Sequence, residues 1–267
     1  MAFASPIISS DALEARFAAL AGAGRKALVV YVTAGHPDRA RSAALLAGLP
    51  DAGADVVELG VPFSDPMADG PVIQASSRTA LEAGMTFDGT LELAAAAPRE
   101  TPLVLFTYLN PLLSAGPTAL ERAADSGIAG ILVTDLPLGA DPGLERRIVD
   151  GPLAFVRLVA PTTPASRMAA IAAYGRGFVY LISRLGVTGE QVELARDLGV
   201  HVERLRAASG LPICVGFGIS TPAQARAAAD LADGVVVGSA IVRAAEEQGV
   251  DRALELVRRL RDALDER

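Results

Sequence analysis

Lysine is almost absent from the sequence, and this scarcity excludes two kinds of chemistry. The 267 residues contain a single lysine, Lys26, and all other positive side chains are arginines. A Schiff-base aldolase needs a lysine at the active face, and a covalently held pyridoxal phosphate needs one too. Lys26 comes directly before the first apolar run rather than after it, at the end away from an active face. Both mechanisms are therefore excluded.

Histidine and cysteine are scarce as well. His36 falls in a predicted loop and His201 in a segment with helical spacing, so we expect no cluster of metal ligands and no metal site. The single Cys214 sits in the apolar run "LPICVG". This position is typical of a small buried hydrophobic residue in a reducing compartment.

The chain also lacks basic clusters and long apolar helices. Its net charge is −7 and only 4% of its residues are aromatic, so nucleic acid is not an expected partner. The start, "MAFASPIISSDALEARF", has no basic region and does not resemble a signal peptide. The uncharged stretch 101–120 is long enough to span a bilayer, but its three prolines favour a buried strand followed by a loop. We expect a cytoplasmic protein without a membrane partner.

Eight short apolar runs alternate with longer segments of helical spacing. Nearly continuous apolar runs are typical of strands buried on both faces. The runs are "ALVVYVT" (27–33), "DVVEL" (55–59), "PLVLFTY" (102–108), "GILVT" (130–134), "LAFVRLV" (153–159), "GFVYLIS" (177–183), "PICVGF" (212–217) and "DGVVVG" (233–238). Eight such units without a linker predict an α/β fold, a single-domain (β/α)₈ TIM barrel over residues 1–267. A doubly wound open sheet is the alternative, but no GxGxxG follows the first run.

Two additions to the barrel are predicted. The segment "SSDALEARFAALAGAG" (9–24) reads as an extra N-terminal helix that closes the bottom of the barrel. The second βα unit is the longest, with about forty residues between its strand and the next, so an extra helix fits there. We expect helices near 73–84 and near 87–97.

Two carboxylates stand at the predicted active face, which the loops after the strand ends form. Glu58 lies one residue from the end of the second run, and inside the barrel mouth burial would raise its pKa and suit it for proton transfer. An ion pair with a neighbouring arginine is the alternative. Asp69 lies in the loop "DPMADGP", which alone reads as a turn. The pairing with Glu58 and the length of the loop favour a functional role.

The last two units each end in glycine. "VGFGIS" (215–220) and "VVVGSAIV" (235–242) run from a strand through glycine towards a helix start, where backbone N–H groups can bind an anion. Tight turns alone would also need these glycines, but as a pair they favour a phosphate site. The segment "SRLGVTGE" (183–190) is expected to close over a bound ligand or to be an ordinary surface loop.

Four motifs together resemble the α-subunit family of tryptophan synthase. They are "LGVPFSDPMADGP" (59–71), "GVTGE" (186–190), "VGFGIS" (215–220) and "GSAIV" (238–242), and the resemblance runs from "YVTAGHPD" (31–38) to the last helix. It implies retro-aldol cleavage of indole-3-glycerol phosphate to indole and D-glyceraldehyde 3-phosphate, a step of L-tryptophan biosynthesis. By the family pattern Glu58 handles the proton transfers, and Asp69 bonds the indole N–H.

Further positions carry over from the resemblance. Tyr180 is similar to a tyrosine near the catalytic acid, and Thr188 to a loop threonine that meets Asp69 on closure. The phosphate cradle would comprise Gly189, Phe217, Gly218, Gly238 and Ser239. The walls of the indole pocket would be Tyr31, Ile73, Phe106 and Leu132.

The resemblance also implies a partner. This is the pyridoxal-phosphate β subunit in an α₂β₂ tetramer, contacted through the strand-two loop and "YLNPLL" (108–113), while this chain itself needs no cofactor. Some relatives act alone as lyases that release indole. Two rival functions are an isomerase on another phosphate-binding barrel and a non-catalytic sensor of a phosphorylated ligand.

Overall fold

All strands of the described chain belong to one parallel sheet. The computed structural model describes residues 11–182, 191–216 and 218–266. The strands follow the spatial order β5-β4-β3-β2-β1-β9-β8-β7-β6. They are β1 (Ala27–Thr33), β2 (Val56–Gly60), β3 (Leu103–Thr107), β4 (Ile128–Val133), β5 (Ala154–Phe155), β6 (Arg157–Val159), β7 (Val179–Ile182), β8 (Ile213–Gly216) and β9 (Gly234–Val237).

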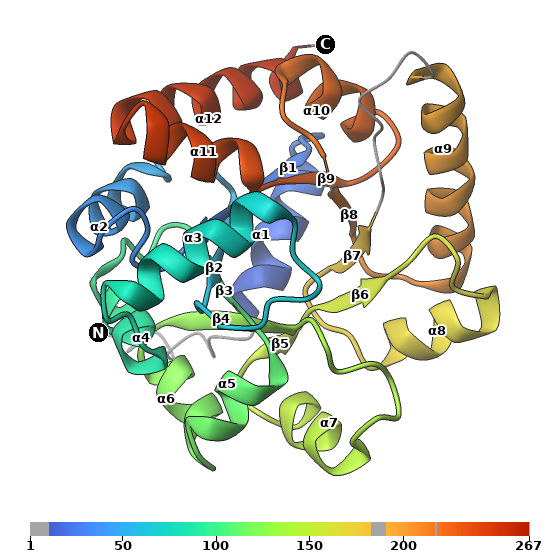
Figure 1. The fold of residues 1–267 in the computed structure, drawn as a ribbon. Helices are drawn as coiled ribbons and strands as arrows, with labels where there is room; N and C mark the ends of the chain where they lie inside the picture. The colour runs from blue at the N-terminus through green and yellow to red at the C-terminus, as the bar shows by residue number, and fades with distance from the viewer. Residues whose placement is uncertain (1–10, 183–190, 217, 267) are drawn as a thin grey trace, which may run out of the picture.

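The two outer strands of this order are halves of one apolar run. β5 pairs with β4 and β6 pairs with β7, and only Val156 separates β5 from β6. The sheet therefore closes on itself through the predicted run 153–159, and the eight runs make an eight-stranded barrel. Figure 1 shows the strands at the centre with the helices around them. The barrel prediction is confirmed, and the open doubly wound sheet is excluded.

The helices follow the strands along the chain, and the second unit has the extra helix that its length predicted. There α3 and α4 both fall between β2 and β3. The helices are α1 (Asp11–Gly22), α2 (Arg39–Gly48), α3 (Pro71–Glu82), α4 (Phe87–Ala96), α5 (Leu109–Ser114), α6 (Ala119–Asp125), α7 (Pro142–Val149), α8 (Ala165–Ala173), α9 (Gln191–Ala208), α10 (Pro222–Ala229), α11 (Ser239–Glu247) and α12 (Val250–Asp265). Within the described residues, no helix is long and apolar enough to cross a membrane.

Side chains alternate between two apolar layers along each strand, as the two-residue repeat requires. On β1, Leu28 and Val30 belong to the large cluster shared with the surrounding helices, whereas Ala27 and Val29 belong to the cluster inside the barrel. Because side chains fill the barrel interior, its lower part is a packed core.

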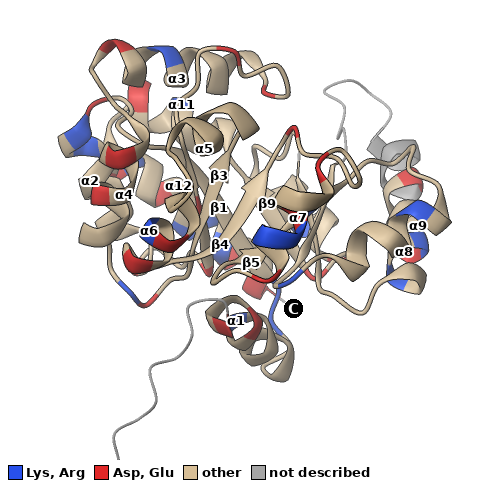
Figure 2. Cartoon of the chain, turned by 90° about the horizontal axis from the view of Figure 1, so that it is seen from below, with Lys and Arg blue, Asp and Glu red and all other residues tan. Residues whose placement is uncertain are grey.

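Helix α1 closes the bottom of the barrel, as predicted. Its Leu13, Phe17 and Leu20 are buried in the interior cluster, and the rings of Phe17 and Phe178 lie 5.3 Å apart. Figure 2 shows α1 beyond one end of the strands. Burying side chains of this size stabilises the fold by about 1.5–3 kcal/mol each, so this helix contributes strongly to the stability of the lower face.

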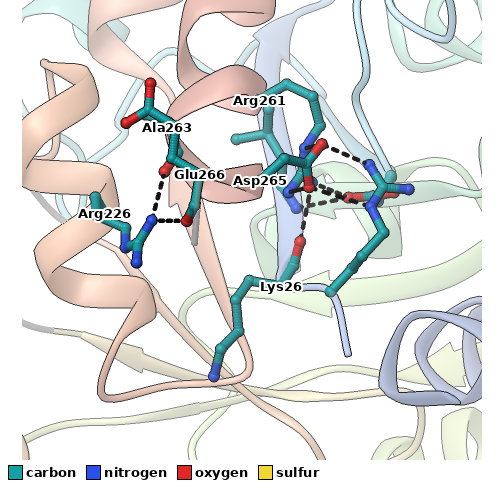
Figure 3. Close-up of polar contacts among 9 residues, drawn as sticks. Lys26, Arg226, Arg261, Ala263, Asp265 and Glu266 are labelled. Atoms are coloured by element: carbon teal, nitrogen blue, oxygen red, sulfur yellow. Dashed lines mark hydrogen bonds and ion pairs between the residues drawn. The ribbon is translucent and has the colours of Figure 1, made fainter. Parts of the chain in front are cut away.

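Helix α12 is bound to the same end of the barrel by a buried arginine. Arg261 donates from Nη1 to the carbonyl oxygen of Lys26 and to Oδ2 of Asp55, each at 2.9 Å, and it also pairs with Asp265 (Figure 3). Nearby, Arg226 donates to the carbonyl oxygens of Ala263 and Glu266 at the end of α12. The contacts of Arg261 join the last helix to the starts of β1 and β2, and those of Arg226 join it to α10.

Candidate active site

A cavity of about 370 Å³ opens at the carboxyl ends of the strands. The structure brings most of the described candidate residues together around it. The candidates among its lining residues are Tyr31, Glu58, Asp69, Ile73, Phe106, Tyr180, Gly218, Gly238 and Ser239. The cavity thus combines two carboxyl groups, three aromatic side chains and the two glycine-rich strand ends.

Glu58 is buried, and among the described residues no hydrogen bond to its Oε1 offsets the cost of burying its carboxyl group. In the sheet it lies between Tyr31 of β1 and Val104 of β3, and its side chain points into the barrel mouth. The residue is 1% exposed, and its Oε1 has no hydrogen-bond partner among the described residues. Burial raises the pKa of Glu58 from 4.5 to about 8. The side chain is therefore mainly protonated at neutral pH and can donate a proton to a ligand.

No arginine in the described part of the chain forms a salt bridge with Glu58, and Arg184 lies outside the described residues. The arginines that are buried lie elsewhere. Arg157 is 3.7 Å from Glu145, and Arg261 is 2.9 Å from Asp55. A charged partner would favour the carboxylate, and among the described residues Glu58 has none, so burial acts on it unopposed there.

Asp69 has a different environment. It lies in the loop between β2 and α3, and its Oδ2 accepts a hydrogen bond of 2.9 Å from the hydroxyl of Tyr108. The same hydroxyl accepts from the N–H of Ala68 at 3.0 Å, and Gln74 donates to the backbone oxygen of Asp69 at 3.0 Å. Burial raises the pKa of Asp69 to about 6, although the bond from Tyr108 opposes this rise. Asp69 is mainly ionised at neutral pH.

The two carboxylates are therefore in opposite protonation states between about pH 6 and pH 8. Such a pair, with pKa values set apart by local environment, is the pattern of sites that use one acid and one charged stabilising group. The arrangement can transfer a proton at Glu58 and stabilise a positive charge near Asp69.

Two tyrosines complete the mouth, and two glycines make room for them. A Cβ atom at Gly60 would lie 2.1 Å from the hydroxyl oxygen of Tyr31, and one at Gly216 would lie 2.3 Å from that of Tyr180. Neither distance is possible for a real side chain, so both positions require glycine. Burial, and then the nearby Glu58, raise the pKa of Tyr180 well above its usual value. Tyr180 remains a neutral hydroxyl beside the acid.

The glycine-rich ends form a concave backbone site. Gly218 has a φ of 83°, a left-handed conformation that residues with a side chain rarely adopt. Gly238 is the N-cap of α11, and no side chain caps that helix start. The first N–H groups of α11 are thus available to an anion, which the partial positive charge at the helix N-terminus favours. Ser239 adds a hydroxyl at the first helical position.

Some candidates are not at the cavity. Leu132 is fully buried in the interior cluster of the barrel and is not among the residues that line the cavity. Thr188, Gly189 and Phe217 lie outside the described residues, as does the rest of 183–190.

Six residues that line the cavity were not candidates from the sequence: Gly70, Ile219, Ser220, Val236, Ala240 and Arg243. Tyr108, which directly follows β3, could be placed at a strand end from the sequence but was given no role in the site. Arg243 lines the cavity from α11. It follows Ser239 by four residues, a spacing that places both side chains on one helix face. This spacing can be read from the sequence.

The residues considered for other chemistries lie elsewhere. Lys26 donates to the backbone oxygen of Ala232 at 2.7 Å, at the lower end of the barrel. His36 is buried after β1, and His201 lies within α9. In the described ranges, no group of histidine, cysteine, aspartate and glutamate side chains could hold a metal ion.

The chain is thus a TIM barrel whose cavity at the strand ends combines two carboxyl groups with two glycine-rich strand ends. Residues 17–265 match the family model described as the tryptophan synthase alpha chain. The chain is 48% identical over 240 residues to the tryptophan synthase alpha chain of Caulobacter vibrioides (strain NA1000 / CB15N), which covers 88% of this chain and 87% of the relative. The chain belongs to the tryptophan synthase alpha chain family, the lyases that cleave indole-3-glycerol phosphate in tryptophan biosynthesis.

Other relatives extend this similarity over nearly the whole chain. The tryptophan synthase alpha chain of Laribacter hongkongensis (strain HLHK9) is 45% identical over 260 residues, covering 95% of this chain and 98% of the relative. The crystal structure of tryptophan synthase subunit alpha from Legionella pneumophila str. Paris has a TM-score of 0.87 and 34% identity, covering 95% of this chain and 98% of that one.

Proposed function

We propose that Glu58 and Asp69 carry the cleavage of indole-3-glycerol phosphate, the reaction of this family, without a cofactor in this chain. The observation that supports these roles is the difference between the two carboxyl environments. The pKa of Glu58 is raised to about 8 by burial, whereas that of Asp69 is raised only to about 6. One group can therefore donate a proton at neutral pH while the other carries a negative charge.

The proton balance follows from these two states. Neutral Glu58 donates its proton to ring carbon C3 of the indole, and the positive charge that develops on the ring nitrogen is stabilised by ionised Asp69. The carboxylate of Glu58 then accepts the proton of the glycerol hydroxyl next to the ring while the carbon–carbon bond breaks. Indole and D-glyceraldehyde 3-phosphate result, and Glu58 regains its proton. A pKa near the working pH suits a group that acts first as an acid and then as a base.

The rest of the cavity matches the two ends of this substrate. Tyr31 and Phe106 meet edge to face with ring centroids 5.1 Å apart, and with Ile73 of α3 they offer an apolar wall for the indole ring. Gly218, Gly238 and Ser239 lie at the strand ends that lead to α10 and α11, where backbone N–H groups can hold the phosphate.

The decisive experiment is an assay of indole release from indole-3-glycerol phosphate by the wild type and by Glu58→Gln. Glutamine keeps the size of the side chain but cannot supply the proton, so we expect a loss of turnover on the order of a hundredfold or more. Glycerol phosphate should bind both proteins equally in calorimetry. An isomerase would release no indole, and a ligand sensor would show no turnover to lose.

The phosphate cradle has its own test. Gly238→Val puts a branched side chain where the anion approaches the backbone, so the affinity for glycerol phosphate should fall sharply in a folded protein. Gly210→Val, at a lower-face position with open space around its backbone, is the matched control. Unchanged affinity in Gly238→Val would move the phosphate away from this cradle.

A partner that contains pyridoxal phosphate, the β subunit of an α₂β₂ assembly, is supported by two exposed apolar side chains. Met67 in the strand-two loop is 90% exposed and Leu113 on α5 is 55% exposed, both in the segments expected to contact the partner. Tyr108, next to α5, bonds Asp69, so a protein that docks on α5 would act on a catalytic group. We place this assembly in the cytoplasm.

A titration with the β subunit from the same source tests the partnership. Turnover of indole-3-glycerol phosphate should rise at least roughly tenfold as the partner is added, equivalent to about 1.4 kcal/mol in the barrier. The two proteins should elute together in size-exclusion chromatography. A flat titration without co-elution, combined with good activity of the free chain, would identify a lyase that works alone.

A further inference from the structure

Arg243 is the one cationic side chain among the described residues that line the active-site cavity. The other charged groups there are the two carboxyls, and Asp69 is mainly ionised at neutral pH. A phosphate monoester carries about −1.5 to −2 charges at pH 7. The helix start that faces it supplies only about half a positive charge. The cavity therefore needs a further positive charge if it is to favour a phosphorylated ligand.

The position of Arg243 on α11 fits this need. It follows Ser239 by four residues, so the two side chains lie on the same helix face, and both line the cavity. Ser239 is the first residue of α11 and belongs to the phosphate cradle. An arginine one turn further along can reach back towards the helix N-terminus, since helical side chains point in that direction.

The guanidinium group of Arg243 is also unoccupied. Among the described residues no hydrogen bond or ion pair involves it, whereas Arg252 of the neighbouring helix pairs with Glu255. Arg243 is exposed. A solvated arginine with its donors free can form a bidentate contact with phosphate oxygens.

A second cavity of about 410 Å³ adjoins the first on the outer side of Arg243. The two share Ser220, Ala240 and Arg243, and the outer cavity is also lined by Arg252 and Arg259 of α12. Arg243 thus stands where the active-site mouth meets an arginine-rich groove. On a chain with a net charge of −7, a local positive region raises the concentration of an anionic substrate at the mouth.

We propose that Arg243 is a specificity-determining residue that recognises the phosphate group of the substrate, together with the glycine cradle. This inference rests on the proposed function, because it takes the ligand to be a phosphorylated glycerol derivative. Arg243 acts in binding and not in proton transfer. Its loss therefore affects KM and leaves kcat nearly unchanged, since the interaction is the same in the ground state and the transition state.

The test compares Arg243→Gln, Arg243→Lys and the control Arg258→Gln. Arg258 is an exposed arginine on α12 that lines neither cavity, so its replacement removes the same charge from another place. We expect Arg243→Gln to raise KM for indole-3-glycerol phosphate roughly tenfold with kcat within about twofold, as for loss of a partly solvated charged contact. Arg243→Lys should recover a large part of the affinity, and Arg258→Gln should match the wild type.

Two further readouts separate this inference from the proposed function. Calorimetry with glycerol 3-phosphate measures the anion contact without any cleavage, and Arg243→Gln should weaken it while flattening its dependence on salt. Failure of every variant to cleave indole-3-glycerol phosphate would overturn the proposed function and leave the calorimetric result standing. An unchanged KM and glycerol phosphate affinity in Arg243→Gln, with Gly238→Val impaired, would overturn the role of Arg243 alone.

Discussion

Two carboxyl groups on one strand segment have opposite surroundings. Asp55 directly precedes β2 at the lower face of the barrel, and Glu58 lies three residues further on, at the mouth. Both are buried, with 5% and 1% exposure. Asp55 accepts hydrogen bonds of 2.9 Å from Arg261 and from the N–H of Leu28, whereas Oε1 of Glu58 has no partner in the described structure.

The difference explains why one carboxyl group is structural and the other suits catalysis. Burial raises the pKa of each, but at Asp55 the bond from Leu28 and the charge of Arg261 oppose the rise. At Glu58 no described residue opposes it. A buried carboxylate with hydrogen bonds and a cation links elements of the fold, and a buried carboxyl without them holds a proton near neutral pH. The lower face of this barrel thus serves stability and the upper face chemistry.

The largest effect is expected from breaking the lower pair. Arg261→Met leaves Asp55 buried without its cation, which typically costs about 3–5 kcal/mol of unfolding free energy. Urea denaturation at pH 7 measures this loss, and kcat of the folded fraction should stay close to that of the wild type. Arg258→Met on the exposed face of α12 is the control and should change stability by less than about 0.5 kcal/mol. A loss below about 1 kcal/mol in Arg261→Met would refute the structural role of the pair.

A second effect concerns the upper carboxyl and appears in the pH dependence of stability. The pKa of Glu58 is higher in the folded protein, about 8, than the ordinary value of 4.5, so the folded state binds the proton more tightly. Stability from this group is complete below about pH 4.5 and is lost as pH rises towards 8. Glutamine does not ionise, so Glu58→Gln does not lose this stability as the pH rises. Its stability relative to the wild type should grow by about 2–4 kcal/mol between pH 5 and pH 8.5, at about 1.4 kcal/mol per pKa unit.

Urea denaturation at several pH values measures this difference. Glu82→Gln, at an exposed position on α3, should follow the wild type throughout. A constant offset between Glu58→Gln and the wild type across this range would mean that Glu58 ionises normally in the folded protein. The contrast with Asp55 would then disappear.

The smallest effect concerns Asp69, whose surroundings are intermediate between those of Asp55 and Glu58. Tyr108→Phe removes the hydrogen bond that holds the pKa of Asp69 down, so the acidic limb of the kcat/KM profile should move to higher pH. Activity at pH 6 should fall about threefold, because a bond of about 1 kcal/mol corresponds to a pKa rise of about 0.7 unit, with little change at pH 8. Tyr174→Phe, at an exposed tyrosine after α8, should leave the profile unchanged. An unshifted acidic limb in Tyr108→Phe would show that Asp69 does not set it.

The order of elements and the main residues at the mouth could be predicted from the sequence. Apolar runs locate the strands because both faces of a barrel strand are buried, and the length of the second unit predicted α3 and α4. The break at Val156 could not be predicted. It arises because barrel strands are staggered, so that one half of the run pairs with β4 and the other half with β7.

The partners of the carboxyl groups could not be predicted either. The bond from Tyr108 to Asp69 spans 39 positions, and that from Arg261 to Asp55 spans 206. Local patterns carry no information on contacts of this kind. The buried, unpaired state of Glu58 depends on neighbours from several strands, including the tyrosines seated over Gly60 and Gly216. The sequence could therefore name Glu58 and predict that burial raises its pKa, but not which neighbours bury it.

The long separation of Asp55 and Arg261 also has a consequence during protein synthesis. A ribosome that has added Asp55 must add 206 further residues before Arg261 exists, which takes roughly 10–40 s at 5–20 residues per second. The first strand needs its neighbour β9 from the same late region. During this interval Asp55 remains hydrated, and the nascent chain cannot close its barrel. The mouth of the barrel is therefore assembled only after nearly all of the described chain has left the ribosome, and in an incomplete chain Glu58 and Asp69 lie in water as ordinary carboxylates.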